Sequence, residues 1–249
     1  MKRVGCVFLL LQLLMLWGCT EGDPVDDPTE ASLDDGISVM QTDATDDPGT
    51  TDTTETEATE LITVYAGAVE DYLLPLEDYS WEREYAPEIV MIHFCSAVLV
   101  DWDKPYNLEL VRGTFLGNEV SIHYLIDREG KVYCYIPEDR AAWHAGQGTY
   151  GDDDRYTDRM NRYSIGIELM GMGSQEDMAG YMVPAAYETL DPSLLGFTDA
   201  QYDALRLLVE DLCLRYQIPM DAQHIIGHED YASGKTDPGE LFDWARLLN

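Results

Sequence analysis

The chain has 249 residues, of which 45% are apolar, and this is enough to bury the core of one sizeable domain. Its 48 acidic residues against 15 Lys and Arg give a formal net charge of -33. So acidic a surface repels phosphate backbones, which argues against nucleic acid as a partner and favours a soluble, self-repelling protein.

Residues 1–18 have the pattern of an export signal. Lys2 and Arg3 precede an apolar run, Val4–Trp17, that is short for a membrane span. The run ends in L-W-G-C, and this ending resembles the lipobox of bacterial lipoproteins, in which the cysteine, here Cys19, is lipidated and becomes the mature N-terminus. We therefore expect an extracytoplasmic protein anchored to a membrane. The alternative is an ordinary cleaved signal followed by a chance cysteine.

Residues 19–60 are predicted to be an acidic, disordered linker behind the lipidated N-terminus. Between Thr20 and Glu60 there are fourteen Asp or Glu residues and no Lys or Arg. Low hydrophobicity with like charge is typical of disorder. A flexible coil of this length spans on the order of 35 Å. The segment suits a tether that extends the reach of the following domain, or a solubilising spacer.

Residues 61–249 are predicted to form one domain, because apolar segments bounded by turns continue without internal repeats. We expect the protein to be a monomer. Strands are expected at Ile89–His93, Val120–Ile126, Val132–Ile136, Ser164–Leu169 and, as a short run, His224–Ile226. The second and third of these are joined by D-R-E-G, which predicts a β-hairpin.

The clearest helix begins at Thr198. The sequence T-D-A-Q forms a capping box with Gln201, and Phe197 can pack onto Tyr202 one turn later. The helix has to end before Pro219. Its apolar stripe, which faces a core, consists of Tyr202, Leu205, Val209, Leu212 and Tyr216.

Two further helices complete the expected fold. One is predicted near Ile62–Leu74, before the first strand, and the other at Gly239–Leu248. Helices that flank a mixed central sheet define an α/β domain.

Three cysteines fall in the predicted domain, at Cys95, Cys134 and Cys213. Their wide spacing forms no C-x-x-C metal or redox pattern, so we interpret them as small buried apolar residues. One disulfide is possible in an exported protein.

All five histidines also fall in this domain. His93 ends the apolar strand I-V-M-I-H, and His228 lies in I-I-G-H-E-D, again just after an apolar run. Asp237 follows nine residues later in K-T-D-P-G. Two imidazoles and one carboxylate are a suitable set for catalytic zinc, because they leave a fourth position open to water.

Several segments together carry a family resemblance. In chain order they are I-V-M-I-H at Ile89, S-I-H-Y-L-I-D at Ser121, W-H-A-G at Trp143, N-R-Y-S-I-G-I-E-L at Asn161, F-T-D-A-Q at Phe197, and I-I-G-H-E-D followed by K-T-D-P-G. Over Glu88 to Leu248 the chain resembles the type-2 N-acetylmuramoyl-L-alanine amidases, relatives of phage lysozyme-amidases and animal peptidoglycan recognition proteins. The resemblance implies that His93, His228 and Asp237 bind Zn²⁺. It also implies hydrolysis of the amide bond between the muramic acid lactyl group and L-alanine of peptidoglycan or muropeptides.

Glu168 and Lys235 are the expected catalytic residues beside the metal. In S-I-G-I-E-L, strand alternation places Gly166 and Glu168 on one face. Alone, this carboxylate would suit an exposed edge or an ion pair; the resemblance implies a general base that takes a proton from the attacking water and returns it to the leaving amine. Partial burial would raise its pKa. Lys235, otherwise a solvated loop residue, would stabilise the oxyanion.

Trp143 and His144 resemble a family segment that lines the substrate groove, where an aromatic face can pack on a sugar or peptide. We expect His123 and His224 to orient neighbours or to satisfy backbone groups, and either could support a ligand.

The chain departs from the family pattern at three places. Ile122 stands where the recognition-protein branch has a catalytic tyrosine, and Phe94 where many relatives have a second histidine. Residues 173–196 look like an insertion that could shape the groove. A peptidoglycan-binding module without activity and a zinc peptidase that cuts within the stem peptide are the alternative functions.

Overall fold

The structure is a computed structural model that describes residues 69–249. The predicted signal, Cys19, the linker and residues 61–68 lie outside the described residues. Within residues 69–249, no helix combines the length and apolar character needed to cross a membrane.

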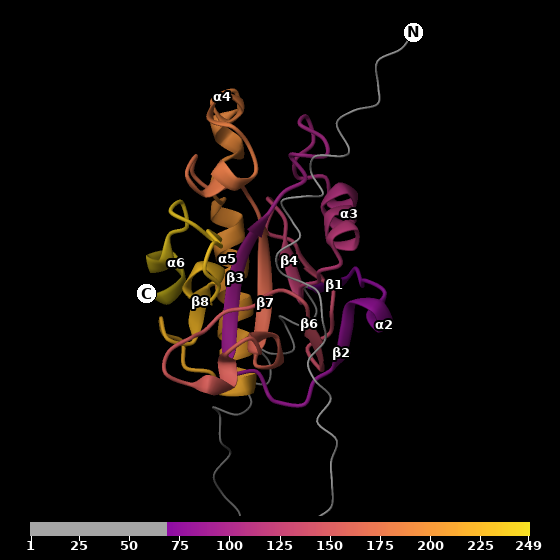
Figure 1. The fold of residues 1–249 in the computed structure, drawn as a ribbon, viewed down its shortest axis with the longest axis vertical. Coiled ribbons are helices and arrows are strands. Elements are labelled where there is room, and N and C mark those ends of the chain that lie inside the picture. The colour runs from indigo at the N-terminus through magenta and orange to yellow at the C-terminus, as the bar shows by residue number, and fades with distance from the viewer. Residues whose placement is uncertain (1–68) are drawn as a thin grey trace, which may run out of the picture. The chain divides into compact units, whose positions relative to one another are not determined.

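A six-stranded sheet forms the centre of the domain, and its neighbouring strands are parallel except for the antiparallel pair β4–β5 (Figure 1). In spatial order it consists of β1 (Val69–Asp71), β5 (Val132–Cys134), β4 (Tyr124–Ile126), β7 (Ser164–Met170), β3 (Ile89–Cys95) and β8 (Ile225–Gly227). A separate antiparallel pair joins β2 (Ser80–Glu82) to β6 (Arg140–Ala142). The predicted α/β class with a mixed sheet is confirmed.

The strand predictions are confirmed in position and differ in length. β4 and β5 form the expected hairpin, but each is shorter than its sequence pattern. Its turn requires glycine, because Gly130 has φ +80° and a Cβ there would lie 2.4 Å from the Ala200 carbonyl oxygen. β3 continues to Cys95, so His93 is the fifth of seven strand residues and lies within the sheet, not at its rim.

The capped helix is confirmed as α5 (Asp199–Tyr216). Thr198 Oγ1 accepts a hydrogen bond from the Gln201 backbone N–H at 3.1 Å, and the Gln201 side chain accepts one from Thr198 N–H at 3.0 Å. The rings of Phe197 and Tyr202 meet edge to face with centroids 6.2 Å apart. Gln217, in the left-handed region with φ 58°, ends the helix before Pro219 is reached.

The helix expected over Ile62–Leu74 is wrong in its described part. Val69–Asp71 is strand β1, which pairs in parallel with β5, so backbone pairing with a distant strand overrides the local pattern. The C-terminal helix α6 is confirmed but shorter, at Trp244–Leu248. The remaining helices are α2 (Leu76–Tyr79), α3 (Leu108–Asn118) and α4 (Pro184–Tyr187), with 3-10 turns η2 (Asp154–Tyr156), η3 (Met160–Arg162), η4 (Asp177–Gly180), η5 (Pro192–Leu194) and η6 (His228–Asp230).

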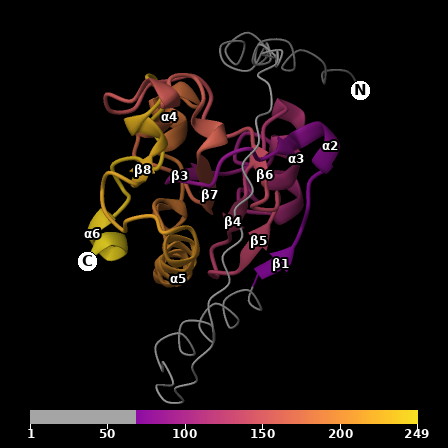
Figure 2. The same cartoon turned by 90° about the horizontal axis from the view of Figure 1, so that it is seen from below.

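The two faces of the sheet have different coverings (Figure 2). α5 packs on one face, where Val90 and Ile92 of β3 join its apolar stripe in the main core. α3 packs on the opposite face, against β4 and β5. Alternation along β3 therefore places His93 on the face opposite α5.

Candidate active site

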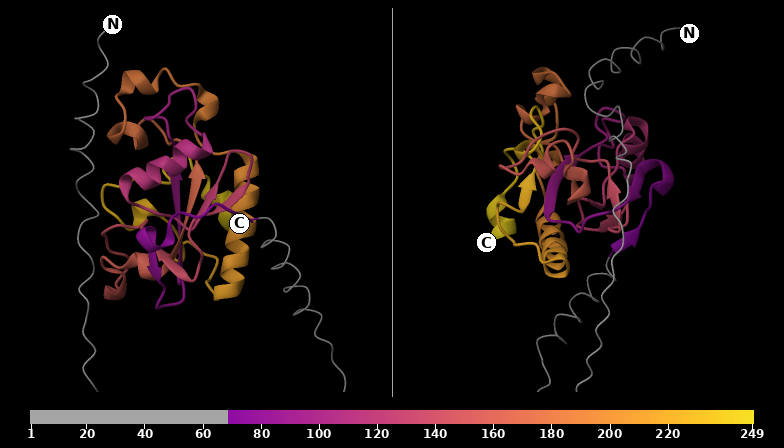
Figure 3. Two further views of the ribbon diagram at one scale, coloured as in Figure 1. Left: turned by 90° about the vertical axis from the view of Figure 1, so that its right-hand side faces the viewer. Right: turned by 60° about the horizontal axis from the view of Figure 1, so that its bottom comes forward.

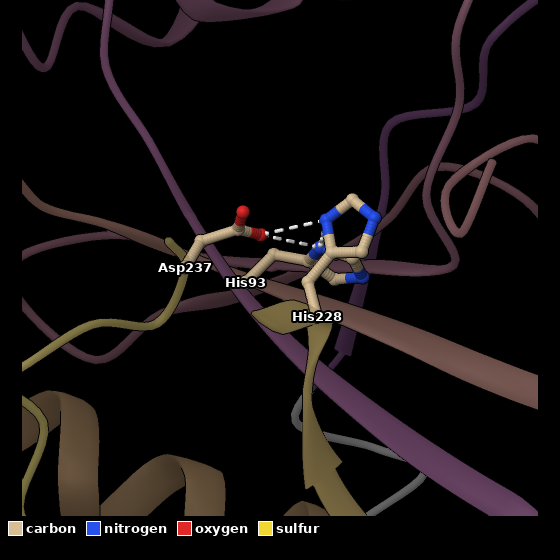
Figure 4. A group of neighbouring side chains, drawn as sticks. All are labelled: His93, His228 and Asp237. Atoms are coloured by element: carbon tan, nitrogen blue, oxygen red, sulfur yellow. Dashed lines mark hydrogen bonds and ion pairs between the residues drawn. The ribbon is translucent and has the colours of Figure 1, made fainter. Parts of the chain in front are cut away.

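Three of the predicted site residues meet on the face opposite α5 (Figure 4). His93 comes from β3, His228 follows β8 directly, and Asp237 lies on the loop before α6. Nδ1 of His93 is 3.1 Å from Nδ1 of His228 and 2.8 Å from Oδ2 of Asp237. The third side of the triangle, from His228 Nδ1 to Asp237 Oδ2, is 3.0 Å. All three residues are buried.

The outer ring nitrogens of both histidines are occupied by hydrogen bonds. His228 Nε2–H donates to the carbonyl oxygen of Ala145 at 2.9 Å. His93 Nε2 lies 3.0 Å from His144 Nδ1, and His144 Nε2 lies 3.1 Å from Ser164 Oγ. Ser164 Oγ–H donates to the Met160 carbonyl oxygen at 2.7 Å. His144 Nε2–H therefore donates to Ser164 Oγ, and His93 Nε2–H donates to His144 Nδ1.

This hydrogen bonding sets the chemistry of the cluster. With Nε2 protonated on both His93 and His228, each Nδ1 presents a lone pair to the other and to the carboxylate of Asp237. Burial lowers the pKa of His93 to about 4, so its ring is neutral near pH 7. Three electron-pair donors within 3.1 Å of one another, with no proton between them, are stable together when a cation binds all three. The donor set fits zinc.

Gly166 explains how His144 comes so close to the sheet. A Cβ at this position of β7 would lie 2.6 Å from His144 Nδ1 and 2.6 Å from Ile122 Cδ1. Real side chains do not tolerate such contacts, so the glycine of S-I-G-I-E-L opens the space in which the imidazole lies.

Glu168 lies beside the cluster, as predicted. It is the residue of β7 directly opposite His93 in the parallel register, and alternation puts it on the same face. Its Oε2 is buried without a hydrogen-bond partner among the described residues, and the thiol of Cys95 lies beside the carboxylate. Burial, and then the negative charge of Asp237, raise the pKa of Glu168 well above its usual value. These conditions favour a proton acceptor.

Lys235 is exposed on the loop that carries Asp237. Its positive charge contributes to lowering the pKa of His93 and opposes the upward pKa shift of Glu168, so the ammonium group lies within electrostatic reach of both. The structure therefore brings this predicted cation to the site.

The two predicted substrate-binding residues have different surroundings. The Trp143 ring packs on Trp81 with centroids 4.1 Å apart, and its backbone N–H donates to Ser121 Oγ at 2.7 Å. His144 has both ring nitrogens engaged, which makes it a support for His93 in addition to its predicted role. The contact of either residue with substrate stays a prediction.

Two further histidines hold backbone groups and turns, as expected. Gly166 N–H donates to His123 Nδ1 at 3.0 Å, and Nε2–H of the same ring donates to the Arg140 carbonyl oxygen at 3.1 Å. His224 Nδ1 lies 2.7 Å from Asp221 Oδ1 in an exposed turn. Ile122, which stands where the recognition-protein branch has a catalytic tyrosine, is fully buried and offers no hydroxyl.

Sequence reasoning missed three supporting residues. Cys95 contacts Glu168, Ser164 ends the hydrogen-bond chain from His93, and Asn161 Oδ1 accepts from the backbone N–H groups of His144 at 3.0 Å and Ala145 at 2.8 Å. Asn161 and Ser164 both lie in N-R-Y-S-I-G-I-E-L, and their place in this family motif was the sequence signal that could have identified them. Cys95, Cys134 and Cys213 are free thiols in the structure.

An α/β domain in which two histidines and one aspartate converge beside a glutamate with a buried carboxylate oxygen has the arrangement expected of a hydrolase active site. Comparison with known proteins narrows the class. Residues 83–240 match the family model described as N-acetylmuramoyl-L-alanine amidase, and the chain belongs to this family of peptidoglycan-hydrolysing amidases. The resemblance carried by the motifs is confirmed.

Individual relatives agree with the family match. The chain is 34% identical over 173 residues to the 1,6-anhydro-N-acetylmuramyl-L-alanine amidase AmpD of Citrobacter freundii, a match that spans 65% of this chain and 79% of the relative. It is 34% identical over 142 residues to the N-acetylmuramoyl-L-alanine amidase AmiD of Escherichia coli, covering 54% of this chain and 45% of AmiD. A crystal structure of a selenomethionine AmpD derivative superposes with a TM-score of 0.51 at 30% identity, over 72% of this chain and 92% of that one.

Proposed function

We propose that this chain is a zinc-dependent amidase in which His93, His228 and Asp237 hold the metal and Glu168 is the general base. The observation that carries the proposal is the convergence of three buried electron-pair donors beside a carboxylate oxygen that has no partner among the described residues. When bound, zinc supplies Lewis-acid chemistry, which polarises the scissile carbonyl and activates water near neutral pH.

The side chains have distinct roles in this proposal. Glu168 takes a proton from the attacking water and delivers it to the amine of L-alanine as the amide bond breaks. Its unpartnered Oε2 leaves room for that proton. Lys235 stabilises the negative charge that develops on the carbonyl oxygen. His144 holds the Nε2 proton of His93 in place, which keeps Nδ1 available to the metal.

The proposed substrate is peptidoglycan or a muropeptide, cut between the lactyl group of muramic acid and L-alanine. The names of two relatives state this bond, AmpD with the 1,6-anhydro form of the sugar and AmiD with the ordinary form. Trp143 lies next to His144 in the chain and supplies an aromatic surface for the sugar or the stem peptide.

We also propose that the protein is a lipoprotein held at a membrane through Cys19, with residues 19–60 as the tether. The sequence L-W-G-C after a short apolar run supports this. Mass spectrometry of the N-terminal peptide is expected to find an acylated Cys19, and Cys19→Ser should release the protein from the membrane fraction. An unmodified cysteine in a membrane-free protein would contradict the anchor without affecting the proposed chemistry.

The amidase proposal is tested by incubating the purified chain with peptidoglycan, with and without a chelator, and identifying the released ends by mass spectrometry. We expect metal-dependent appearance of stem peptides that begin with L-alanine, without new reducing sugars. Peptides with another N-terminal residue would identify a peptidase, and tight binding without cleavage would identify a binding module.

Variants test the general base separately from the metal. Glu168→Gln is expected to retain zinc and to lower kcat by about 10²- to 10⁴-fold, the usual contribution of a positioned base. Glu129→Gln, in the exposed turn of the β4–β5 hairpin, is the matched control and should keep full activity. Equal activity of the two variants would remove Glu168 from its role.

A further inference from the structure

Residues 173–196, which we term the cap lobe, lie beyond the carboxyl end of β7 and carry η4, α4 and η5 (Figures 1 and 3). The lobe has its own small core, which includes a residue of the loop that follows β3. That core consists of Val98, Met172, Met178, Met182 and Leu190. Because β3 and β7 carry His93 and Glu168, the lobe stands at the end of the two strands that form the site.

The cap lobe is fastened to the loop of the proposed metal ligand Asp237. Thr236 Oγ1 donates to the Asp177 carbonyl oxygen at 3.1 Å, and the Glu240 backbone N–H donates to Asp177 Oδ2 at 3.2 Å. The Asp177 side chain packs so closely on this loop that a Cβ at Gly239 would lie 2.6 Å from Asp177 Oδ2. These bonds flank Asp237 on both sides, so the lobe has a defined position relative to the site.

Tyr181 is an exposed aromatic residue of the cap lobe. Its neighbours Met178 and Met182 are buried in the lobe core, whereas Tyr181 is 44% exposed. Its backbone N–H donates to the Met178 carbonyl oxygen at 2.9 Å, which fixes the turn. Partial burial, followed by the negative charges of Asp237 and Glu168, raises the pKa of its phenol. The phenol is therefore within electrostatic reach of both carboxylates and stays protonated at neutral pH.

The hydroxyl of Tyr181 forms no hydrogen bond to the protein in the part of the chain that the structure describes, so it is free to donate to a bound molecule. A neutral donor is well suited to this place. A phenol offers a hydrogen-bond donor without adding a charge to the surroundings of the two carboxylates.

The cap lobe and the loop after β3 that packs on it also carry much of the exposed apolar surface of the domain. Of the ten large hydrophobic side chains that are exposed within residues 69–249, five belong to the cap lobe or to the loop after β3 that packs on it. They are Leu99, Val100, Trp102, Tyr181 and Val183. Aromatic and aliphatic surface next to a polar site is typical of pockets that bind sugars and peptides.

We propose that Tyr181 is a substrate-binding residue of the amidase, donating a hydrogen bond from its hydroxyl to an oxygen of the muramoyl peptide while its ring packs on the substrate. This inference rests on the proposed function and extends it, because it assigns the cap lobe to the substrate-binding surface.

The test compares Tyr181→Phe with Tyr85→Phe, a tyrosine of matched exposure, 45%, that precedes β3 at the opposite end of the strand. Binding of a purified N-acetylmuramoyl tripeptide is measured by calorimetry in the inactive Glu168→Gln background, and kcat and KM are measured in the active enzyme. Loss of one neutral hydrogen bond should raise Kd and KM by about three- to tenfold with Tyr181→Phe. Tyr181→Ala should have a larger effect, and Tyr85→Phe none.

The outcomes separate this inference from the amidase proposal. If the parent enzyme releases stem peptides while Tyr181→Phe leaves both Kd and KM unchanged, Tyr181 is not a substrate-binding residue and the amidase proposal stands. If the parent releases none, the proposed function fails first. If Tyr181→Phe lowers the melting temperature as well as the affinity for the tripeptide, the residue has a structural role and the inference is overturned.

Discussion

Gly166→Ala is expected to weaken metal binding although Gly166 contacts no ligand. The new Cβ would lie 2.6 Å from His144 Nδ1, and ordinary contacts begin at 3.4 Å, so the imidazole has to retreat by about 0.8 Å. His144 is held 3.0 Å from His93 Nε2 and 3.1 Å from Ser164 Oγ. A movement of that size breaks at least one of these bonds.

Two magnitudes follow from this contact. Overpacking by one methyl group in a filled site costs about 1–3 kcal/mol. For a domain of this size that lowers the melting temperature by roughly 2–12 °C, at about 2–4 °C per kcal/mol. Losing the partner that orients a histidine ligand lowers metal affinity by about 10- to 100-fold.

The assay is competition for zinc with a chelator of known affinity, together with calorimetric unfolding. Gly113→Ala is the control, since Gly113 lies in helix α3 with nothing within 4 Å of the new Cβ. It should stabilise the protein by about 0.5–1 kcal/mol and leave zinc affinity unchanged. A Gly166→Ala variant with the parent's zinc affinity and melting temperature would refute the proposed support of His93 by His144.

Three further changes test other parts of the structure. Thr198→Ala removes the capping box with Gln201 and should lower the free energy of unfolding by about 1 kcal/mol in urea titrations, whereas Thr198→Ser should retain most of it. Burial lowers the pKa of His123 to about 3, so the unfolded state binds the proton first as pH falls below 6.5. Stability of the metal-free protein should therefore be full above pH 6.5 and decrease toward pH 4 by up to about 1.4 kcal/mol per unit from this residue, and His123→Gln should flatten the profile. Cys95→Ala removes the thiol beside Glu168 and should lower kcat several-fold, and recovery in Cys95→Ser, which restores a polar O–H group, distinguishes this from a packing effect.

Local sequence patterns determined much of the framework. Period-two alternation in S-I-G-I-E-L placed Gly166 and Glu168 on one face of β7, and the T-D-A-Q capping box located the start of α5. The D-R-E-G turn identified the antiparallel pair β4–β5. These features depend on residues a few positions apart, so their physical causes are contained in a short stretch of chain.

The candidate metal-binding residues could not be predicted from short sequence patterns alone. His228 and Asp237 share a dense local motif, but their meeting with His93, 135 residues before His228, depended on the family pattern. The sequence pattern predicted His93 at the rim of the sheet, whereas two more strand residues follow it and its side chain is buried.

Tertiary structure alone decided which groups support the site. The approach of His144 to His93, the place of Cys95 beside Glu168 and the fastening of the cap lobe to the Asp237 loop depend on strand register and on loop packing. The pairing of β1 with β5, which replaced an expected helix, has the same origin. Such contacts gain their free energy only after distant segments meet, so no short window of sequence carries their signal.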